Sequence, residues 1–258
     1  MSAEPSTIRP SQAFTTEADA LAEALDTTSL DALSACSGWT AHEVAAHLAA
    51  AGVEIALNLE AYGEGRPVPP TRGFEEREKP YRAMGEKALR AELPRSMERM
   101  AAALDAVLMA EPDAVVPWTG RQMVVATFVT HVRSELAIHR WDLVGDDDTS
   151  TKLLAQPELT VHAVTVLGKA LVARGASSAA AGFSAVIATP GARDVVALVD
   201  ADGPRLVRSE ETSEPAVVGD PAARLLFLWG RRPSDPRRLT APGGSQVLAR
   251  LEALLAGY

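Results

Sequence analysis

Ionisable side chains lie on what should be the buried face of one predicted helix, from about Gln122 to Leu143. Residues three and four positions apart share one face of a helix. The residues that share this face are Val124, Phe128, His131, Glu135, Ile138, His139 and Asp142. Burying such groups unpaired is costly, so they must be neutralised by each other, by water or by a metal ion. Glu135 and His139 are close enough for one ion to bridge them.

A glutamate four positions before a histidine is weak evidence by itself, because this spacing occurs three times in the chain. Glu43, which precedes His47, is explained as the capping partner at a helix start. The pair formed by Glu158 and His162 lies outside the helical N-terminal part, and we expect His162 to be structural. His47 lies on the inward face of its own predicted helix, where it can face Glu135 and His139 across a helical bundle.

The N-terminal part, from Ser11 to about Asp146, has the periodicity of helices, with apolar residues recurring at three and four. The predicted helices run from about Ala13 to Leu25, from after Trp39 to near Gly63, from about Arg82 to Leu108 and from about Gln122 to Leu143. The start of the second helix is the best defined, since Thr40 and Glu43 form a capping box. Pro94 is expected to kink or split the third helix.

The acidic run from Asp146 to Asp148 indicates a domain boundary, which we place between residues 150 and 151. After it, short β-branched runs predict a small sheet flanked by helices. The expected strands are Ser184 to Ile187, Val195 to Val199 and Leu206 to Ser209. The expected helices are about Glu158 to Arg174, one capped by Asp220 that runs to about Trp229, and Ser245 to Leu255. The predicted fold is therefore a four-helix bundle (1–150) followed by a small α+β domain (151–258).

Composition restricts the class of function. The net charge is −9, and no dense basic stripe opposes it, so nucleic acids and anionic lipid surfaces are unfavourable partners. The apolar stretch Val44 to Leu59 is interrupted by His47 and Glu54, and we expect no membrane-spanning segment. The N-terminus lacks the pattern of a secretion signal. The single cysteine, Cys36, excludes an internal disulfide, so a reducing, cytoplasmic location is expected.

Two segments carry a resemblance to a known family. Residues 36–40 read Cys-Ser-Gly-Trp-Thr and lead into the helix of His47, and residues 135–143 read Glu-Leu-Ala-Ile-His-Arg-Trp-Asp-Leu. They resemble the two signatures of the mycothiol-dependent maleylpyruvate isomerase family: a Cys-Pro-Gly-Trp turn before a helix with a metal-binding histidine, and a Glu and a His four apart followed by Trp-Asp. Ser37 replaces the common proline, which affects turn rigidity more than ligation. The segment from Leu225 to Arg232 resembles the family's C-terminal domain, so the likeness covers most of the chain.

The resemblance implies a DinB-like metal-binding bundle followed by a domain similar to sterol carrier proteins. It also implies that His47, Glu135 and His139 are the protein ligands of a divalent metal, usually zinc. Two imidazoles and one carboxylate with an open position are the ligand set of a catalytic zinc. Arg231 matches an arginine of the family's C-terminal domain, and we expect it to act in catalysis and in binding the thiol.

Three further residues have weaker assignments. His131 is either a fourth ligand, a partner behind the ligands, or a satisfied core histidine. Asp142 is expected to orient His139, as carboxylates beside zinc-bound imidazoles do. Cys36 precedes a helix cap without an evident paired base, so we expect it to be structural rather than nucleophilic.

The implied reaction uses mycothiol or a similar low-molecular-weight thiol as cosubstrate, since a metal deprotonates a coordinated thiol at neutral pH. If the product keeps the sulfur, the protein is a thiol S-transferase acting on a small electrophile, which we favour from the sequence. If the thiol adds and leaves again, it is a cis–trans isomerase of a maleylpyruvate-like substrate. A metal-dependent hydrolase and a non-catalytic metal-binding regulatory module are further alternatives. The expected state is a monomer or homodimer.

Overall fold

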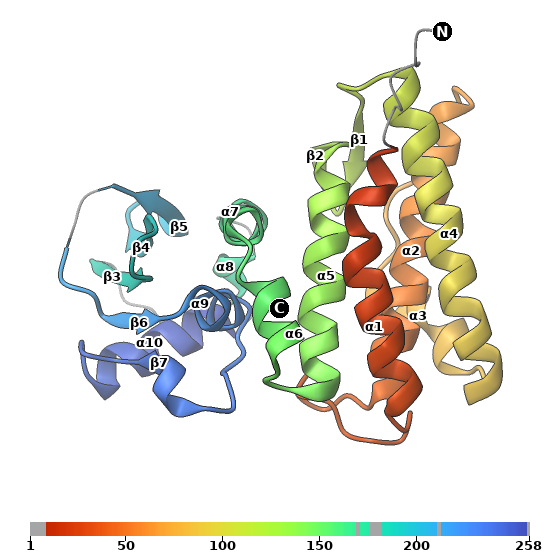
Figure 1. The fold of residues 1–258 in the computed structure, drawn as a ribbon. Helices are drawn as coiled ribbons and strands as arrows, with labels where there is room; N and C mark the ends of the chain where they lie inside the picture. The colour runs from red at the N-terminus through yellow and green to blue at the C-terminus, as the bar shows by residue number, and fades with distance from the viewer. Residues whose placement is uncertain (1–8, 169–170, 176–181, 211–212, 257–258) are drawn as a thin grey trace, which may run out of the picture. The chain divides into compact units, whose positions relative to one another are not determined.

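The computed structural model describes residues 9–168, 171–175, 182–210 and 213–256. Its contacts divide the chain into two compact units, Met1–Leu143 and Val144–Tyr258, which we call the N-terminal and C-terminal units (Figure 1). The N-terminal unit is helical and the C-terminal unit is mixed α and β, so the predicted fold class is confirmed.

The N-terminal unit is built around four long helices that share one core. Its elements are η1 (Pro10–Phe14), α1 (Thr15–Thr27), α2 (Ala41–Gly63), α3 (Phe74–Arg82), α4 (Glu86–Ala110), β1 (Val115–Trp118), β2 (Arg121–Val124) and α5 (Thr127–Val144). Helix α2 packs closely against α4 along its length and against the short α3. Since α2 and α5 carry the candidate ligands, the packing of this core decides how those residues meet.

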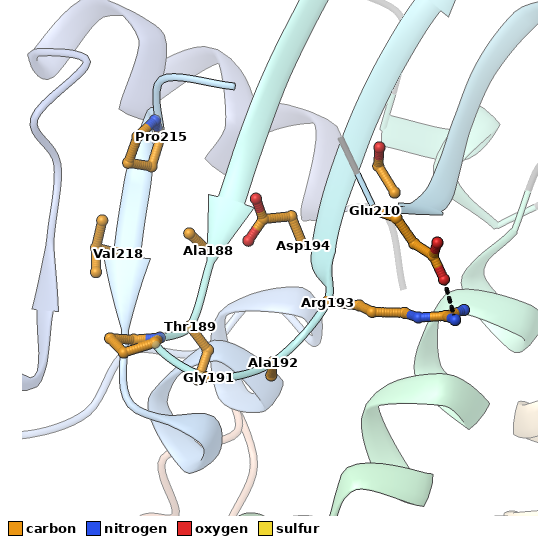
Figure 2. Close-up of a pocket in the computed structure, with 11 residues that line it drawn as sticks. Ala188, Thr189, Gly191, Ala192, Arg193, Asp194, Glu210, Pro215 and Val218 are labelled. Atoms are coloured by element: carbon orange, nitrogen blue, oxygen red, sulfur yellow. Dashed lines mark ion pairs between the residues drawn. The ribbon is translucent and has the colours of Figure 1, made fainter. Parts of the chain in front are cut away.

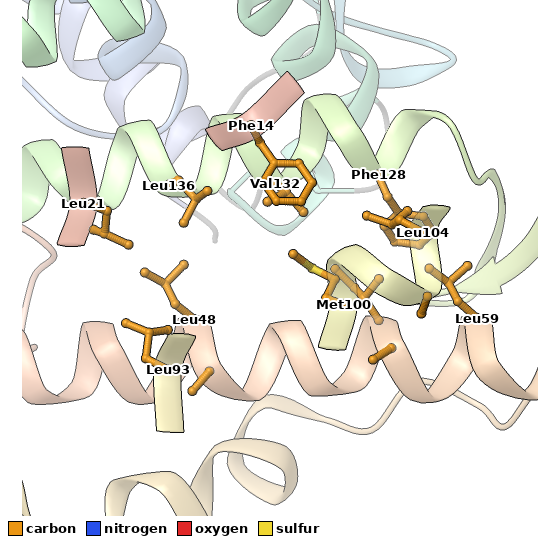
Figure 3. Close-up of a cluster of buried hydrophobic side chains, with 14 of the residues drawn as sticks. Phe14, Leu21, Leu48, Leu59, Leu93, Met100, Leu104, Phe128, Val132 and Leu136 are labelled. Carbon is orange, nitrogen blue, oxygen red and sulfur yellow. The ribbon is translucent and has the colours of Figure 1, made fainter. Parts of the chain in front are cut away.

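Apolar side chains from η1, α1, α2, α4 and α5 meet in a single cluster, because each helix places its apolar residues at intervals of three and four on one face. Figure 3 shows this cluster, in which the labelled side chains are Phe14, Leu21, Leu48, Leu59, Leu93, Met100, Leu104, Phe128, Val132 and Leu136. All of them are buried. The helices are therefore held together by close packing, which gives the polar site a rigid scaffold.

Helix α2 begins as the sequence predicts. The backbone N–H of Thr40 donates to Glu43 Oε2 at 2.7 Å, and the N–H of Glu43 donates back to Thr40 Oγ1 at 3.4 Å. Of the helices in the described part of the chain, α2 is the one whose length and composition would allow it to cross a membrane. However, 78% of its most apolar window is buried inside the structure, so α2 packs as the core helix of the bundle.

The third predicted helix is wrong in its boundaries. The chain forms two helices here, α3 and α4, which are separated by residues 83–85. Pro94 does not split α4, which is continuous from Glu86 to Ala110. Helix α3 has few apolar residues and an internal proline, Pro80. These features made the segment before Arg82 look like a loop in the sequence.

The fourth predicted helix starts too early. Residues 121–124 form strand β2, which pairs with β1 in a hairpin. The two residues between the strands, Thr119 and Gly120, have φ values of 48° and 80°. Two positive φ values are typical of the type I′ turn that favours tight hairpins. Val124 is therefore an exposed strand residue and does not share the face of α5.

The C-terminal unit contains a five-stranded sheet with helices packed against it. Its elements are α6 (Asp148–Leu154), α7 (Pro157–Leu167), α8 (Val172–Gly175), β3 (Phe183–Ala188), β4 (Asp194–Asp200), β5 (Gly203–Ser209), β6 (Val217–Gly219), α9 (Pro221–Leu228), η3 (Pro236–Arg238), β7 (Leu239–Thr240) and α10 (Ser245–Leu255). The strand order is β5-β4-β3-β6-β7, with β3 and β6 parallel and the other pairs antiparallel. The three predicted strands are confirmed as β3, β4 and β5. The short strands β6 and β7 and helix α6 were not predicted.

Two helix ends in this unit have clear local causes. The Asp220 side chain accepts a hydrogen bond from the N–H of Ala223, which confirms the predicted cap of α9. The predicted helix from Glu158 to Arg174 is interrupted, because α7 ends at Leu167 and Gly168 follows with a φ of 35°. Part of the expected continuation, residues 169–170, lies outside the described residues.

Candidate metal centre

The structure brings together the three predicted ligands from two helices of the bundle. His47 lies two turns into α2, and Glu135 and His139 lie one turn apart on α5. One ligand-type atom from each of the three lies within 4.8 Å of the other two. The side chains of His47 and His139 are only 8% and 7% exposed, whereas that of Glu135 is 21% exposed. The cluster is therefore buried on the imidazole side and reachable from the carboxylate side.

The spacing of the donor atoms suits a small cation. Nε2 of His47 lies 3.3 Å from Glu135 Oε2, and Nε2 of His139 lies 3.6 Å from the same oxygen. Ligand atoms around a tetrahedral zinc with bonds of about 2.0 to 2.1 Å lie about 3.4 Å apart. Each imidazole Nε2 thus already lies from the Glu135 oxygen at about the separation that one shared ion requires, and all three donor atoms lie within 4.8 Å of one another.

The other nitrogen of each imidazole is held by a buried carboxylate. Nδ1 of His139 lies 2.8 Å from Asp142 Oδ2, and Nδ1 of His47 lies 2.7 Å from Glu78 Oε1. A carboxylate can only accept, so each Nδ1 carries a proton. Each Nε2 faces the Glu135 carboxylate, to which it donates when it is protonated; when it is deprotonated, its lone pair is available to a cation. This donor set fits a divalent metal.

Glu78 is a site residue that the sequence interpretation missed. It comes from α3 and its side chain is fully buried. Its second oxygen accepts a hydrogen bond from Arg82 at 2.6 Å. Burial opposes the charged form, but the hydrogen bonds from His47 and Arg82 outweigh it and hold the pKa of Glu78 below its ordinary value. The one available signal was the spacing of Glu78 and Arg82, four apart in a stretch that read as a loop.

Aromatic rings surround the two imidazoles. The Trp39 ring lies 5.3 Å from that of His47 and stacks at 6.4 Å on that of His139, with an interplanar angle of 11°. The Phe74 ring of α3 stacks against His47 at 5.9 Å. Arg82 lies over the Trp39 ring at 5.5 Å. These rings restrict rotation of the imidazoles and lower the local polarity, which strengthens electrostatic interactions at the cluster.

The pKa values of Glu135 and His139 show that the cluster favours a bound positive charge. Burial opposes ionisation of Glu135, but hydrogen bonds from His139 and His47 hold its pKa well below the ordinary value. Burial also disfavours the charged form of His139, yet hydrogen bonds to Asp142 and Glu135 raise its pKa to about 9. Without a metal, a proton therefore stays on His139 at neutral pH.

The remaining candidates lie outside the cluster. His131 is one turn before Glu135 on α5, is not part of the three-residue group, and has a pKa lowered by burial. Cys36 is half-buried in the turn before α2. Arg231 belongs to the C-terminal unit, where its Nη1 donates to the carbonyl oxygen of Trp229 at 2.8 Å. Its predicted role in catalysis and thiol binding stays a prediction.

A cavity in the C-terminal unit has a different character (Figure 2). It lies at the β3–β4 connection, and its described lining includes no histidine or cysteine. Its arginine, Arg193, pairs with Glu210. This cavity therefore lacks the imidazole donors of the cluster formed by α2 and α5.

Comparisons with known proteins agree with this geometry. Residues 11–144 match the family model of the mycothiol maleylpyruvate isomerase N-terminal domain. The chain is similar in fold to the crystal structure of the mycothiol-dependent maleylpyruvate isomerase, with a TM-score of 0.61, 17% identity and 92% of each chain covered. A histidine-to-alanine variant of that enzyme matches with the same TM-score and coverage at 16% identity. No curated protein matches the sequence.

The family match is more extensive than a single motif. It spans more than half of the chain and contains both helices that carry the cluster, so the predicted resemblance is confirmed. The chain belongs to the mycothiol maleylpyruvate isomerase family, which is a family of enzymes.

Proposed function

We propose that the protein is a metal-dependent enzyme that uses mycothiol to isomerise a cis double bond in a small, conjugated carboxylate resembling maleylpyruvate. The observation that carries this proposal is the convergence of two imidazole Nε2 atoms on one carboxylate oxygen of Glu135, a side chain that is partly exposed. The family supports an isomerase better than the S-transferase that we favoured from the sequence, because the family and the solved structures of this fold bear the isomerase name.

The ligand set supports zinc as the metal, with His47, Glu135 and His139 leaving one position open. A metal bound there would lower the pKa of a coordinated thiol, so that the thiol is ionised at neutral pH. Reversible addition of a thiolate to a conjugated double bond, rotation about the new single bond and loss of the thiolate convert cis to trans without net use of thiol.

The chain's own residues prepare the site for this reaction. Glu78 and Asp142 hold the protons on the Nδ1 atoms and thereby fix the orientation of both imidazoles. Glu135 contributes a carboxylate that stays ionised at neutral pH. The rings of Trp39 and Phe74 shield His47 from water. Each of these contributions exists before any ligand binds, so the site is preorganised.

The decisive experiment measures isomer conversion and free thiol in the same reaction. Metal-loaded protein is incubated with mycothiol and maleylpyruvate, and we expect many turnovers to the trans isomer with a constant concentration of free thiol. Stoichiometric loss of thiol would instead show a transferase. Conversion of substrate without added thiol would favour a hydrolase-type mechanism. His139→Ala should abolish conversion, whereas His42→Ala, which removes a histidine of α2 outside the cluster, should retain it.

A further inference from the structure

Arg77 of α3 is a buried guanidinium whose charge the fold leaves unpaired. The residue is 5% exposed, and its Nε is buried without a hydrogen-bond partner among the described residues. Two of the carboxylates whose charge acts on Arg77 are already engaged by other arginines. Glu78 pairs with Arg82, and Glu54 pairs with Arg72. The contact found for the Arg77 guanidinium in the described structure is a cation–π contact, 4.4 Å above the Phe74 ring.

Keeping such a charge costs stability. Burial lowers the pKa of Arg77, and the carboxylates of Glu78 and Glu135 offset this only in part. Arginine nevertheless remains protonated in proteins. A buried cation without a hydrogen-bonded anion is therefore an unfavourable feature of the free protein. Features of this kind concentrate at functional sites, where a ligand supplies the missing partner.

Arg77 lies beside the metal cluster. Phe74, one turn before it on α3, stacks on the His47 ring and also lies under the Arg77 guanidinium. The guanidinium is thus one aromatic ring away from a candidate ligand, and its neighbour Glu78 holds the Nδ1 of that ligand. Phe74 is 54% exposed, so solvent and small molecules reach this side of the site.

We propose that Arg77 is the anion-recognition residue of the site and binds a carboxylate of the substrate. This inference rests on the proposed function, in which the substrate is a small conjugated carboxylate. A guanidinium presents a planar fork that matches a carboxylate with two hydrogen bonds. The substrate carboxylate provides the negative charge and the hydrogen-bond acceptors that the Arg77 guanidinium lacks in the free protein. A site with an unpaired polar group also rejects neutral analogues strongly, because that group then stays unpaired.

The test compares a charged probe with a neutral one. Maleate, a dicarboxylate, and dimethyl maleate, its neutral diester, are titrated calorimetrically into metal-loaded wild type and into Arg77→Met. Arg99→Met is the control, because it removes one exposed cation that pairs with Glu60 on the bundle surface. We expect the wild type to prefer maleate. We expect Arg77→Met to bind maleate at least about tenfold more weakly, which corresponds to about 1.4 kcal/mol, and Arg99→Met to match the wild type.

Thermal melting separates this role from a structural one. An arginine that holds the fold together should lower the melting temperature when it is replaced, without changing maleate affinity. We expect the opposite, with Arg77→Met at least as stable as the wild type, since it removes a buried unpaired charge. Arg77→Gln is a second neutral variant that serves the same comparison if the methionine variant does not fold.

Three results would overturn the proposal. They are wild-type maleate affinity in a folded, metal-loaded neutral variant, a wild type that binds the diester as tightly as maleate, and wild-type turnover kinetics in Arg77→Met. The proposed isomerase function can fail separately. If the protein does not convert maleylpyruvate but maleate binding still depends on Arg77, the anion subsite stands and the assigned reaction is wrong.

Discussion

Replacing Glu78 by glutamine tests whether this buried carboxylate prepares His47 for metal binding. The substituted side chain would keep the volume and one acceptor for the Nδ1–H of His47, now 2.7 Å from the carboxylate. It would lose the negative charge, and its amide N–H₂, a donor, would face the Arg82 guanidinium, also a donor, where Glu78 Oε2 now accepts. We therefore expect α3 to remain folded, with His47 less firmly oriented and its imidazole a weaker donor.

The expected magnitude follows from the geometry. A hydrogen bond to a charged group contributes about 1.5 to 3 kcal/mol, and the Glu78 side chain is fully buried, so solvent does not weaken this one. Partners behind metal-bound histidines typically change metal affinity about 10- to 100-fold. This range corresponds to about 1.4 to 2.8 kcal/mol. The two ranges overlap, so we expect a loss of zinc affinity of this size for Glu78→Gln.

The assay is competition for zinc with a chromogenic chelator, followed in wild type, Glu78→Gln and Glu76→Gln. Glu76 is an exposed residue of the same helix, so its replacement changes the net charge equally without touching His47. Circular dichroism reports whether each variant remains folded. Wild-type zinc affinity in folded Glu78→Gln would refute the orienting role. An equal loss in Glu76→Gln would show that the effect is general electrostatics rather than the contact with His47.

Four further outcomes are expected. Purified protein should bind close to one divalent metal per chain, and His47→Ala or His139→Ala should remove most of it; full metal content in both variants would contradict the site. Hydrogen bonds to Asp142 and Glu135 outweigh burial and raise the pKa of His139 to about 9. Zinc binding at pH 7 should therefore release about one proton, and the apparent zinc affinity should rise about tenfold per pH unit until about pH 9. Calorimetry in buffers of different ionisation enthalpy measures the number of protons released, and repeating it at several pH values measures the change in affinity. Cys36→Ser should keep thiol-dependent turnover, and loss of turnover with metal and fold intact would make the cysteine catalytic. Arg231→Ala should lower kcat/KM at least about tenfold, or about 1.4 kcal/mol, at unchanged metal content, and Arg231→Lys should have an intermediate kcat/KM. Wild-type kinetics in Arg231→Ala would show that Arg231 has no role in binding or catalysis.

The ligand helices could be predicted because their signals are local. The capping box of Thr40 and Glu43 needs only residues three apart, and it fixes the phase of α2 and hence the inward direction of His47. The pair of Glu135 and His139 needs only residues four apart on one helix. Neither signal depends on tertiary structure, so both survive in the sequence.

The rest of the site depends on contacts between distant segments. Glu78 acts on His47 across 31 positions of sequence, and it does so from a nine-residue helix that contains Pro80 and few apolar residues. Periodicity cannot reveal such a helix, because its stability comes from packing on α2 rather than from its own pattern. Val124 was assigned to α5 for the converse reason, since its spacing fits a helix although the Thr119–Gly120 turn places it in a strand.

The polar groups of the site favour binding of a cation, and a bound cation would in turn favour binding of an anion. In the absence of metal, Asp142 and Glu135 hold a proton on His139 up to a pKa of about 9, so the cluster captures the one small cation available to it. A divalent ion bound here would replace that proton and would be bound by the lone pairs of both Nε2 atoms, whose orientation Glu78 and Asp142 fix through Nδ1. Its positive charge would then favour an anion beside Glu135, whose side chain is 21% exposed. The unpaired guanidinium of Arg77 beside the same cluster would strengthen that preference, and this would offset its cost to the free protein.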